Sequence, residues 1–155
     1  MTTSSDSSRP GASSAPAYDG SARAVVTALN EAFRAADYMR MAALYDDDID
    51  WLFHGPVSIF PEIGHRRGKA AVFRSFEMLN TLFHFQRHVT EQLIAEQDWA
   101  AGIADITMTQ RTTGRIIQCR IANFNRVRDG RVVEYRGFCD TFDAVEQTLG
   151  RELTV

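Results

Sequence analysis

The sequence predicts an α+β fold in which a cone-shaped, curved antiparallel β-sheet is wrapped around N-terminal helices. Apolar residues recur at helical spacing in residues 21–36, 37–45 and 69–83. Beyond residue 83, apolar and polar residues alternate with a period of two, which is the pattern of strands. Helices followed by a run of strands are typical of folds in which the helices gather on one face of a sheet.

Composition and charge fit one domain and argue against two classes of partner. A chain of 155 residues with 45% hydrophobic side chains can bury a core and an internal pocket, whereas two domains would each be too small. The net charge of -3 argues against a general nucleic-acid binder, which needs a basic face. No apolar run reaches the roughly 20 residues of a membrane span, so we expect neither nucleic acid nor membrane as a partner.

Residues 1–20 consist largely of Ser, Ala, Pro and Gly and contain almost nothing to bury. We expect a disordered tail there and a single domain in residues 21–155. The tail lacks the continuous apolar stretch of a secretory signal. Cys119 and Cys139 lack metal-binding or redox spacing, so we predict that they are small buried hydrophobes in a cytoplasmic protein.

The first two helices carry start signals, since Ser21 and Asp37 precede them as N-caps. The acidic run 46–48 ends the second helix. Carboxylates are unfavourable at a helix C-terminus, so we predict a solvated turn there and not a metal site. A short strand, residues 49–54, follows.

The loop in residues 55–64 is unusually apolar and contains Val57, Ile59 and Phe60. Loops usually carry small polar residues, so this one is either a flap over a cavity or a loop packed on the core. The basic cluster 65–69 lacks the glycines of a phosphate loop and is predicted to be a solvated surface.

Two strands, 84–96 and 99–109, precede a hairpin in residues 115–140 and a terminal helix in residues 141–150. His84 and His88 are four residues apart, but in a predicted strand without a third ligand nearby in sequence we expect them to lie at the surface or at the edge of the pocket. We therefore expect no metal, and nothing in the chain calls for a bound cofactor.

Asp129-Gly130 predicts the hairpin turn, because both central residues of a type I′ turn need positive φ. With a two-residue turn, one face is apolar and the other polar; a bulge would exchange the two faces on one strand. The apolar face would hold Ala122, Phe124, Val133, Tyr135 and Gly137, and the polar face Asn123, Asn125, Glu134 and Arg136.

Three stretches together resemble the SnoaL-like, ketosteroid-isomerase-related branch of the nuclear transport factor 2-like superfamily. They are the acidic run with the Trp51 strand, residues 64–72, and residues 127–140. The resemblance covers residues 21–149. It implies a pocket for a small hydrophobic molecule, a homodimer through the outer sheet face, and cofactor-independent acid–base chemistry on a polyketide- or steroid-like molecule. The alternatives are a non-catalytic ligand-binding or dimeric interaction module and, further off, an epoxide hydrolase-like enzyme.

Few catalytic residues of these relatives are matched. Gly55 holds the place of the isomerase aspartate, with His54 beside it, and Leu29 falls where the isomerases have a tyrosine. The arginine and two aspartates of the epoxide hydrolases align with Ile103, Asp105 and Gly137. Only the first aspartate of that triad is therefore present.

Asp105 interrupts an apolar strand and shares a face with Trp99, Ile103 and Thr107. If that face looks into the hollow, a carboxylate among apolar walls becomes a candidate base. The predicted catalytic residues are thus Asp105 and His54. The other reading is that Asp105 pairs with an arginine such as Arg115 or Arg120. The predicted pocket residues are Trp51, Phe60, Trp99, Ile103, Phe124, Tyr135 and Gly137.

The opposite face of the same strand carries small apolar residues, which suit close packing of two sheets. We therefore predict that this face forms the dimer contact. Its members are Ala100, Gly102, Ala104, Ile106 and Met108.

Overall fold

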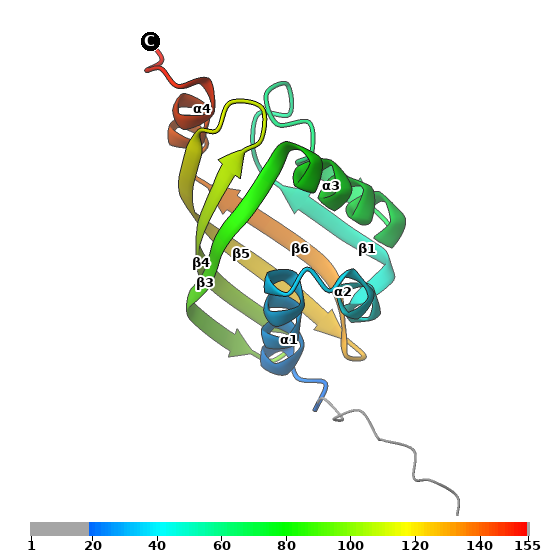
Figure 1. Ribbon diagram of the computed structural model, residues 1–155. Coiled ribbons are helices and arrows are strands. Elements are labelled where there is room, and N and C mark those ends of the chain that lie inside the picture. Colours follow the sequence, from blue (N-terminus) through cyan, green and yellow to red (C-terminus); the bar gives the residue numbers. More distant parts are fainter. Residues whose placement is uncertain (1–18, 155) are drawn as a thin grey trace, which may run out of the picture.

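The structure, a computed structural model, describes residues 19–154 and has the predicted α+β architecture (Figure 1). Almost all of the predicted tail, residues 1–18, lies outside the described residues. The elements in order are α1 (Ala22–Arg34), α2 (Tyr38–Leu44), β1 (Tyr45–Phe53), β2 (Gly64–Arg67), α3 (Lys69–Leu82), β3 (Phe83–Glu96), β4 (Trp99–Gln110), β5 (Ile116–Arg128), β6 (Arg131–Cys139) and α4 (Thr141–Leu149).

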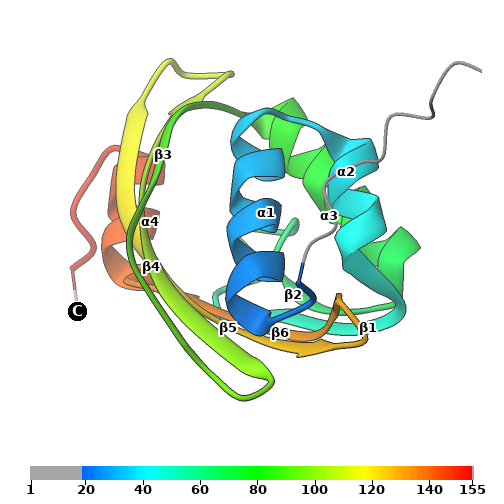
Figure 2. The ribbon, with the colours of Figure 1, turned by 90° about the horizontal axis from the view of Figure 1, so that it is seen from below.

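One six-stranded sheet, in the order β2-β1-β6-β5-β4-β3, curls around α1, α2 and α3 like a cone (Figure 2). All neighbouring strands are antiparallel except β1 and β6, which run parallel. Residues of α1, β1 and the inner sheet face form the main core, with Val26, Ile49 and Val132 almost fully buried. None of the helices in residues 19–154 has both the length and the apolar run that a bilayer crossing requires.

The helices begin where the cap signals place them. The side chains of Ser21 and Asp37 accept hydrogen bonds from the backbone N–H groups of Ala24 and Arg40. Asp140 caps α4 in the same way, with its Oδ1 3.1 Å from the Asp143 nitrogen. Each cap satisfies a backbone donor that the helix itself leaves without a partner.

The region between α2 and α3 differs from the prediction. The acidic run belongs to β1 and not to a turn, because Tyr45 and Ile49 on the same strand are buried and hold it against the helices. Part of the basic cluster forms β2, which was not predicted. Lys69 pairs with Asp47 at 2.8 Å, so an ion pair joins β1 to the start of α3.

The hairpin turn is confirmed, but its predicted faces are wrong on one strand. Asp129 and Gly130 have φ of 51° and 71°, as a type I′ turn requires. A bulge then shifts the register, so that Asn125 pairs with Tyr135 and not with Glu134. As a result Asn123 and Asn125 face inward, and Phe124 faces outward.

Candidate functional site

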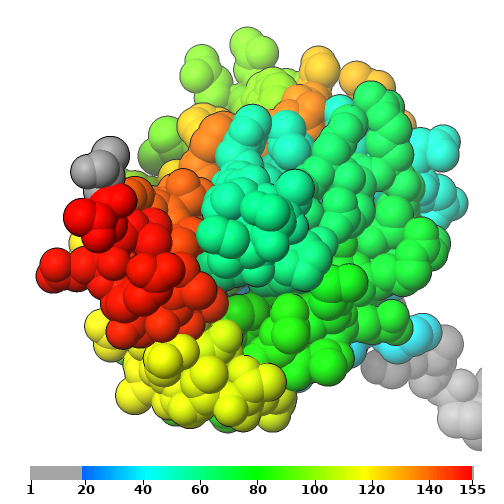
Figure 3. Space-filling view, turned by 90° about the horizontal axis from the view of Figure 1, so that it is seen from above, coloured from blue at the N-terminus to red at the C-terminus, as the bar shows by residue number. Residues whose placement is uncertain are grey.

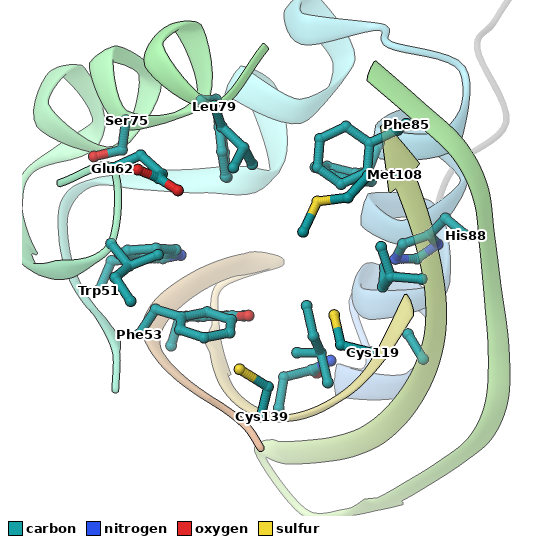
Figure 4. Close-up of a pocket in the computed structure, with 18 of the residues that line it drawn as sticks. Trp51, Phe53, Glu62, Ser75, Leu79, Phe85, His88, Met108, Cys119 and Cys139 are labelled. Atoms are coloured by element: carbon teal, nitrogen blue, oxygen red, sulfur yellow. The ribbon is translucent and has the colours of Figure 1, made fainter. Parts of the chain in front are cut away.

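A cavity of about 170 Å³ lies between the helices and the inner face of the sheet. Its walls are mostly apolar, and a few polar side chains face into it (Figure 4). The loop after β1, α3, α4 and the turn between β4 and β5 meet at one end of the molecule, around a small hollow (Figure 3). The expected chamber beneath the sheet is therefore present and open, and Phe60 from the apolar loop lines it.

The structure separates the predicted pocket residues into two groups. Trp51, Phe60 and Tyr135 line the cavity. The remaining predicted residues are not among its lining side chains: Trp99, Ile103, Phe124, Gly137 and the two proposed catalytic residues, Asp105 and His54.

Asp105 does not face the cavity, so its predicted orientation is wrong. Its Oδ2 accepts a hydrogen bond from Nε of Arg87 at 2.9 Å, and its side chain is 30% exposed. An arginine partner was the alternative that the sequence left open, although the partner is on β3. The outward position removes the apolar surroundings that would have made Asp105 a base.

The residues of β4 were grouped correctly into two faces, but the face predicted to lie inside lies outside, and the reverse. Ala104, Ile106 and Met108 line the cavity, and Ala100 is buried in the core. These small side chains face inward because α1 crosses β3, β4 and β5 there and needs room. The predicted dimer face of small residues is thus the inner face.

His54 lies beyond the end of β1 and is exposed on the outer side. Its ring stacks on Phe138, with centroids 4.5 Å apart. Phe138 in turn meets the outward-facing ring of Phe124 edge-on. His54 therefore belongs to an aromatic cluster on the outer sheet face and not to the cavity.

Gly137 contributes space and no functional group. A Cβ at this position would lie 2.6 Å from Cδ2 of Phe53 and 2.7 Å from the hydroxyl oxygen of Tyr135. Only glycine allows these two rings to pack so close to the strand.

The acidic side chain that lines the cavity is Glu62. It is 4% exposed, lines the cavity, and its Oε2 has no hydrogen-bond partner among residues 19–154. Burial raises the pKa of Glu62 above its ordinary value, because the charged form loses contact with water. Glu62 is thus a buried carboxyl group whose charged form is disfavoured.

The loop that carries Glu62 is held on two sides, at the neighbouring residues Phe60 and Pro61. Nη2 of Arg66 donates to the carbonyl oxygen of Pro61 at 2.8 Å, and Nε donates to the hydroxyl of Ser75 at the same distance. On the other side, Phe60 packs with Ala144 and Val145 of α4. The loop is therefore a fixed wall, which positions Glu62 firmly.

Three further buried polar groups on the cavity wall lack partners among the described residues. They are Nε1 of Trp51, Nδ1 of His88 and Oδ1 of Asn125. Buried polar groups are nearly always hydrogen-bonded, so four such atoms around one cavity indicate a place where a ligand or water completes the hydrogen bonds. Glu62 and Trp51 lie on one side of the cavity, and His88 lies on the opposite side (Figure 4).

The protonation of these groups follows from burial. Burial raises the pKa of the Tyr135 hydroxyl and lowers that of His88, which nearby Arg34 lowers further. Burial also raises the pKa of the Cys119 thiol to about 12. At neutral pH Tyr135 is thus a hydrogen-bond donor, His88 is uncharged and Cys119 is a poor nucleophile.

With the geometry established, comparison with known proteins places the chain in a family. The model of the SnoaL-like domain matches residues 26–135. The chain belongs to the SnoaL-like domain family. No curated protein matches it.

Solved structures share the fold of this SnoaL-like domain. A candidate isomerase from Rhodopseudomonas palustris is 36% identical, with a TM-score of 0.73 over 81% of this chain and 93% of that one. An NTF2-like protein from Burkholderia thailandensis is 25% identical, with a TM-score of 0.73 over 83% and 97%. IdmH, a candidate polyketide cyclase from Streptomyces antibioticus, is 22% identical, with a TM-score of 0.67 over 81% and 96%, and so shares the fold.

Within residues 19–154 of the SnoaL-like domain, no three His, Cys, Asp or Glu side chains lie close enough together to hold a metal ion. The cavity instead presents single polar groups on an apolar wall, which suits binding and proton transfer.

Sequence reasoning missed Glu62, although a signal was present. The residue is a lone charge between Pro61 and Ile63, in the loop already singled out as apolar. A single carboxylate in a segment that covers a cavity deserves the same weight as one in a strand. The two asparagines were missed because the face that they occupy depends on a bulge in β6. His88, which was expected at the surface or at the edge of the pocket, lines the cavity.

Proposed function

We propose that this SnoaL-like domain is a cofactor-independent enzyme of the isomerase or cyclase type, with Glu62 as the group that moves a proton. The proposal depends on one observation: a buried carboxyl group, whose Oε2 has no hydrogen-bond partner among residues 19–154, lies on the wall of an apolar cavity. Burial raises the pKa of Glu62 above its ordinary value, which makes its carboxylate a stronger base.

In the proposed reaction, the Glu62 carboxylate removes a proton from the carbon next to a carbonyl group. The C–H electron pair forms the C–C double bond of an enolate, and the negative charge moves to the carbonyl oxygen. The indole N–H of Trp51 and the hydroxyl of Tyr135 are the donors available to stabilise that oxygen.

The second half of the reaction distinguishes the two reaction types. In isomerisation, Glu62 returns the proton to a different carbon of the same molecule. In cyclisation, the enolate carbon attacks a second carbonyl group, and the new alkoxide takes the proton from Glu62. Both outcomes leave the carboxylate ready for another cycle.

Cavity size favours a small substrate. The volume of about 170 Å³ is below the roughly 300–1,000 Å³ of drug-sized pockets and close to the roughly 150 Å³ engineered cavity that binds benzene. A single ring fits without rearrangement, whereas a four-ring steroid does not. We therefore propose a monocyclic carbonyl compound, such as a short polyketide-like molecule.

An epoxide hydrolase mechanism receives no support from the cavity, because Ile103 and Asp105 lie on the outer face. Binding without catalysis is the main alternative, and the same unpartnered groups would then serve only to orient a ligand.

Deuterium incorporation separates catalysis from binding. The purified protein is incubated in deuterium oxide with cyclohexanone and with β,γ-cyclohexenone, and exchange at the carbon next to the carbonyl is followed by NMR. The proposal expects exchange above the buffer rate, and conjugation of the enone. Binding of these ketones without any exchange would favour the non-catalytic module.

We also propose a homodimer through the outer sheet face, around its aromatic cluster. Phe124 and Phe138 are 46% and 39% exposed, and the Trp99 ring nearby carries the Arg126 guanidinium 5.7 Å from its centroid. Exposed aromatic rings with an arginine are typical of interface centres.

Phe138→Asp is expected to produce a monomer, with a mass near 17.4 kDa by light scattering where the unaltered protein gives twice that value. A buried charge at the centre of a symmetric contact would be desolvated twice. Met39→Asp is the matched control, since Met39 is 84% exposed on α2, away from the sheet face. A monomeric unaltered protein at working concentration would contradict the proposal.

A cytoplasmic location remains part of the proposal. Both cysteines, Cys119 and Cys139, are free thiols. Free thiols are usual in a reducing compartment.

A further inference from the structure

A second hollow, of about 680 Å³, lies outside the cavity, between the end of α1, the start of α2 and the first half of β3. We call it the β3 groove. Tyr38 and Asn80 meet across it, because the Asn80 amide donates a hydrogen bond to the Tyr38 hydroxyl. The groove shares four wall residues with the cavity, namely Phe33, Phe83, Phe85 and His88.

The charges in the β3 groove are all of one sign. Three arginines line it, and no Asp or Glu does. Arg87 is paired with Asp105, but Arg34 and Arg111 have no carboxylate partner among residues 19–154. The groove therefore has two uncompensated positive charges.

Arg111 is also oriented for binding. Its Nε donates to the carbonyl oxygens of Asn80 and Phe83, at 2.9 and 3.2 Å. These bonds fix the planar guanidinium at the groove, while its two terminal nitrogens have no hydrogen-bond partner among the described residues. An arginine anchored in this way can present a pair of parallel N–H groups to a carboxylate or phosphate.

The groove also has an apolar wall, which consists of aromatic rings. Phe33 and Phe85 pack edge to face with centroids 5.4 Å apart, and the His88 ring lies 5.1 Å from Phe33. A ligand that combines an apolar group with one anionic group would contact this wall and the arginines together.

We propose that the β3 groove binds a small organic anion, with its carboxylate or phosphate group on Arg34 and Arg111 and its apolar part against Phe33 and Phe85. This site goes beyond the proposed proton transfer and does not depend on it. His88 lies in both walls, so a ligand in the groove would contact a residue that also lines the cavity.

The test uses isothermal titration with phenylacetate, its neutral isostere phenylacetamide, and phenyl phosphate, at low ionic strength. Phenylacetate is expected to bind at least about tenfold more tightly than phenylacetamide, because charge-assisted hydrogen bonds form only with the acid. The preference should shrink with added salt, since the groove is open to solvent. Stronger binding of phenyl phosphate than of phenylacetate would also support the site and would identify phosphate as the preferred anion.

Arg34→Gln and Arg111→Gln should each remove most of the preference for the acid. The side chain of Arg34 makes no hydrogen bond within residues 19–154, so Arg34→Gln still tests the proposal if Arg111→Gln fails to fold. Arg120→Gln makes the same change in net charge at the outer face, where Arg120 pairs with Glu91, and should keep the preference.

Equal binding of acid and amide, or a preference that survives in the folded groove variants, would overturn the proposal. Glu62→Gln should bind phenylacetate as the unaltered protein does, so loss of catalysis and loss of anion binding are separate results.

Discussion

Glu62→Gln is expected to lower kcat for exchange of the proton next to the carbonyl by about 10²–10⁴-fold, which is the usual contribution of a general base. The substitution keeps the shape and the hydrogen-bonding capacity of the side chain but removes its ability to take a proton. Binding of the ketone should change little, because the cavity wall is otherwise intact. Steady-state kinetics of β,γ-cyclohexenone conjugation separate kcat from KM.

The pH profile gives an independent check on Glu62. The proposed base works as the carboxylate, so activity should fall as pH decreases through its raised pKa, at a higher pH than for an ordinary glutamate. Asp105→Asn is the matched carboxylate-to-amide control on the outer face, and its activity should stay within about twofold, since it loses only an exposed ion pair. Unchanged kcat in Glu62→Gln would remove Glu62 from the mechanism.

Trp51→Phe is expected to lower kcat by about 10²–10³-fold, which is typical for removal of one donor to a developing oxyanion. Nε1 of Trp51 is buried at the cavity and has no partner among residues 19–154, so its N–H is available to a ligand. The Trp51 ring stacks on Tyr135 with centroids 5.1 Å apart and planes 7° apart. Phe keeps an aromatic ring for this contact while removing the donor.

Trp99→Phe provides the control for Trp51→Phe. The substitution is the same, but Trp99 lies on the outer face and not at the cavity. Its kcat should match that of the unaltered protein. Equal losses in both variants would indicate a general effect on the fold, and no loss in Trp51→Phe would leave Tyr135 as the donor to be tested.

The architecture could be predicted because local signals agree with it. The caps at Ser21 and Asp37 and the Asp129-Gly130 turn act over a few residues, so the sequence alone reveals them. The order of helices followed by a run of strands predicts the curved sheet around the helices.

The site was predicted less well, because its composition depends on which face of each strand meets the helices. Periodicity correctly grouped Ala104 with Ile106 and Asp105 with Ile103, but it cannot tell inside from outside. The close approach of α1 settles that question in favour of the small side chains. In the hairpin, a single bulge near Val133 places Asn125 at the inner face, where Phe124 was predicted.

The pKa of Glu62 tests the central claim most directly. Carbon-13 NMR of the labelled glutamate carboxyl groups, assigned by comparison with Glu62→Gln, follows the ionisation of this one side chain across pH. Burial on the cavity wall predicts a midpoint above the roughly 4.3 of an ordinary glutamate, moving further when a ketone fills the cavity. A midpoint at or below the ordinary value, indifferent to the ligand, would show a carboxylate exposed to water and would contradict the account.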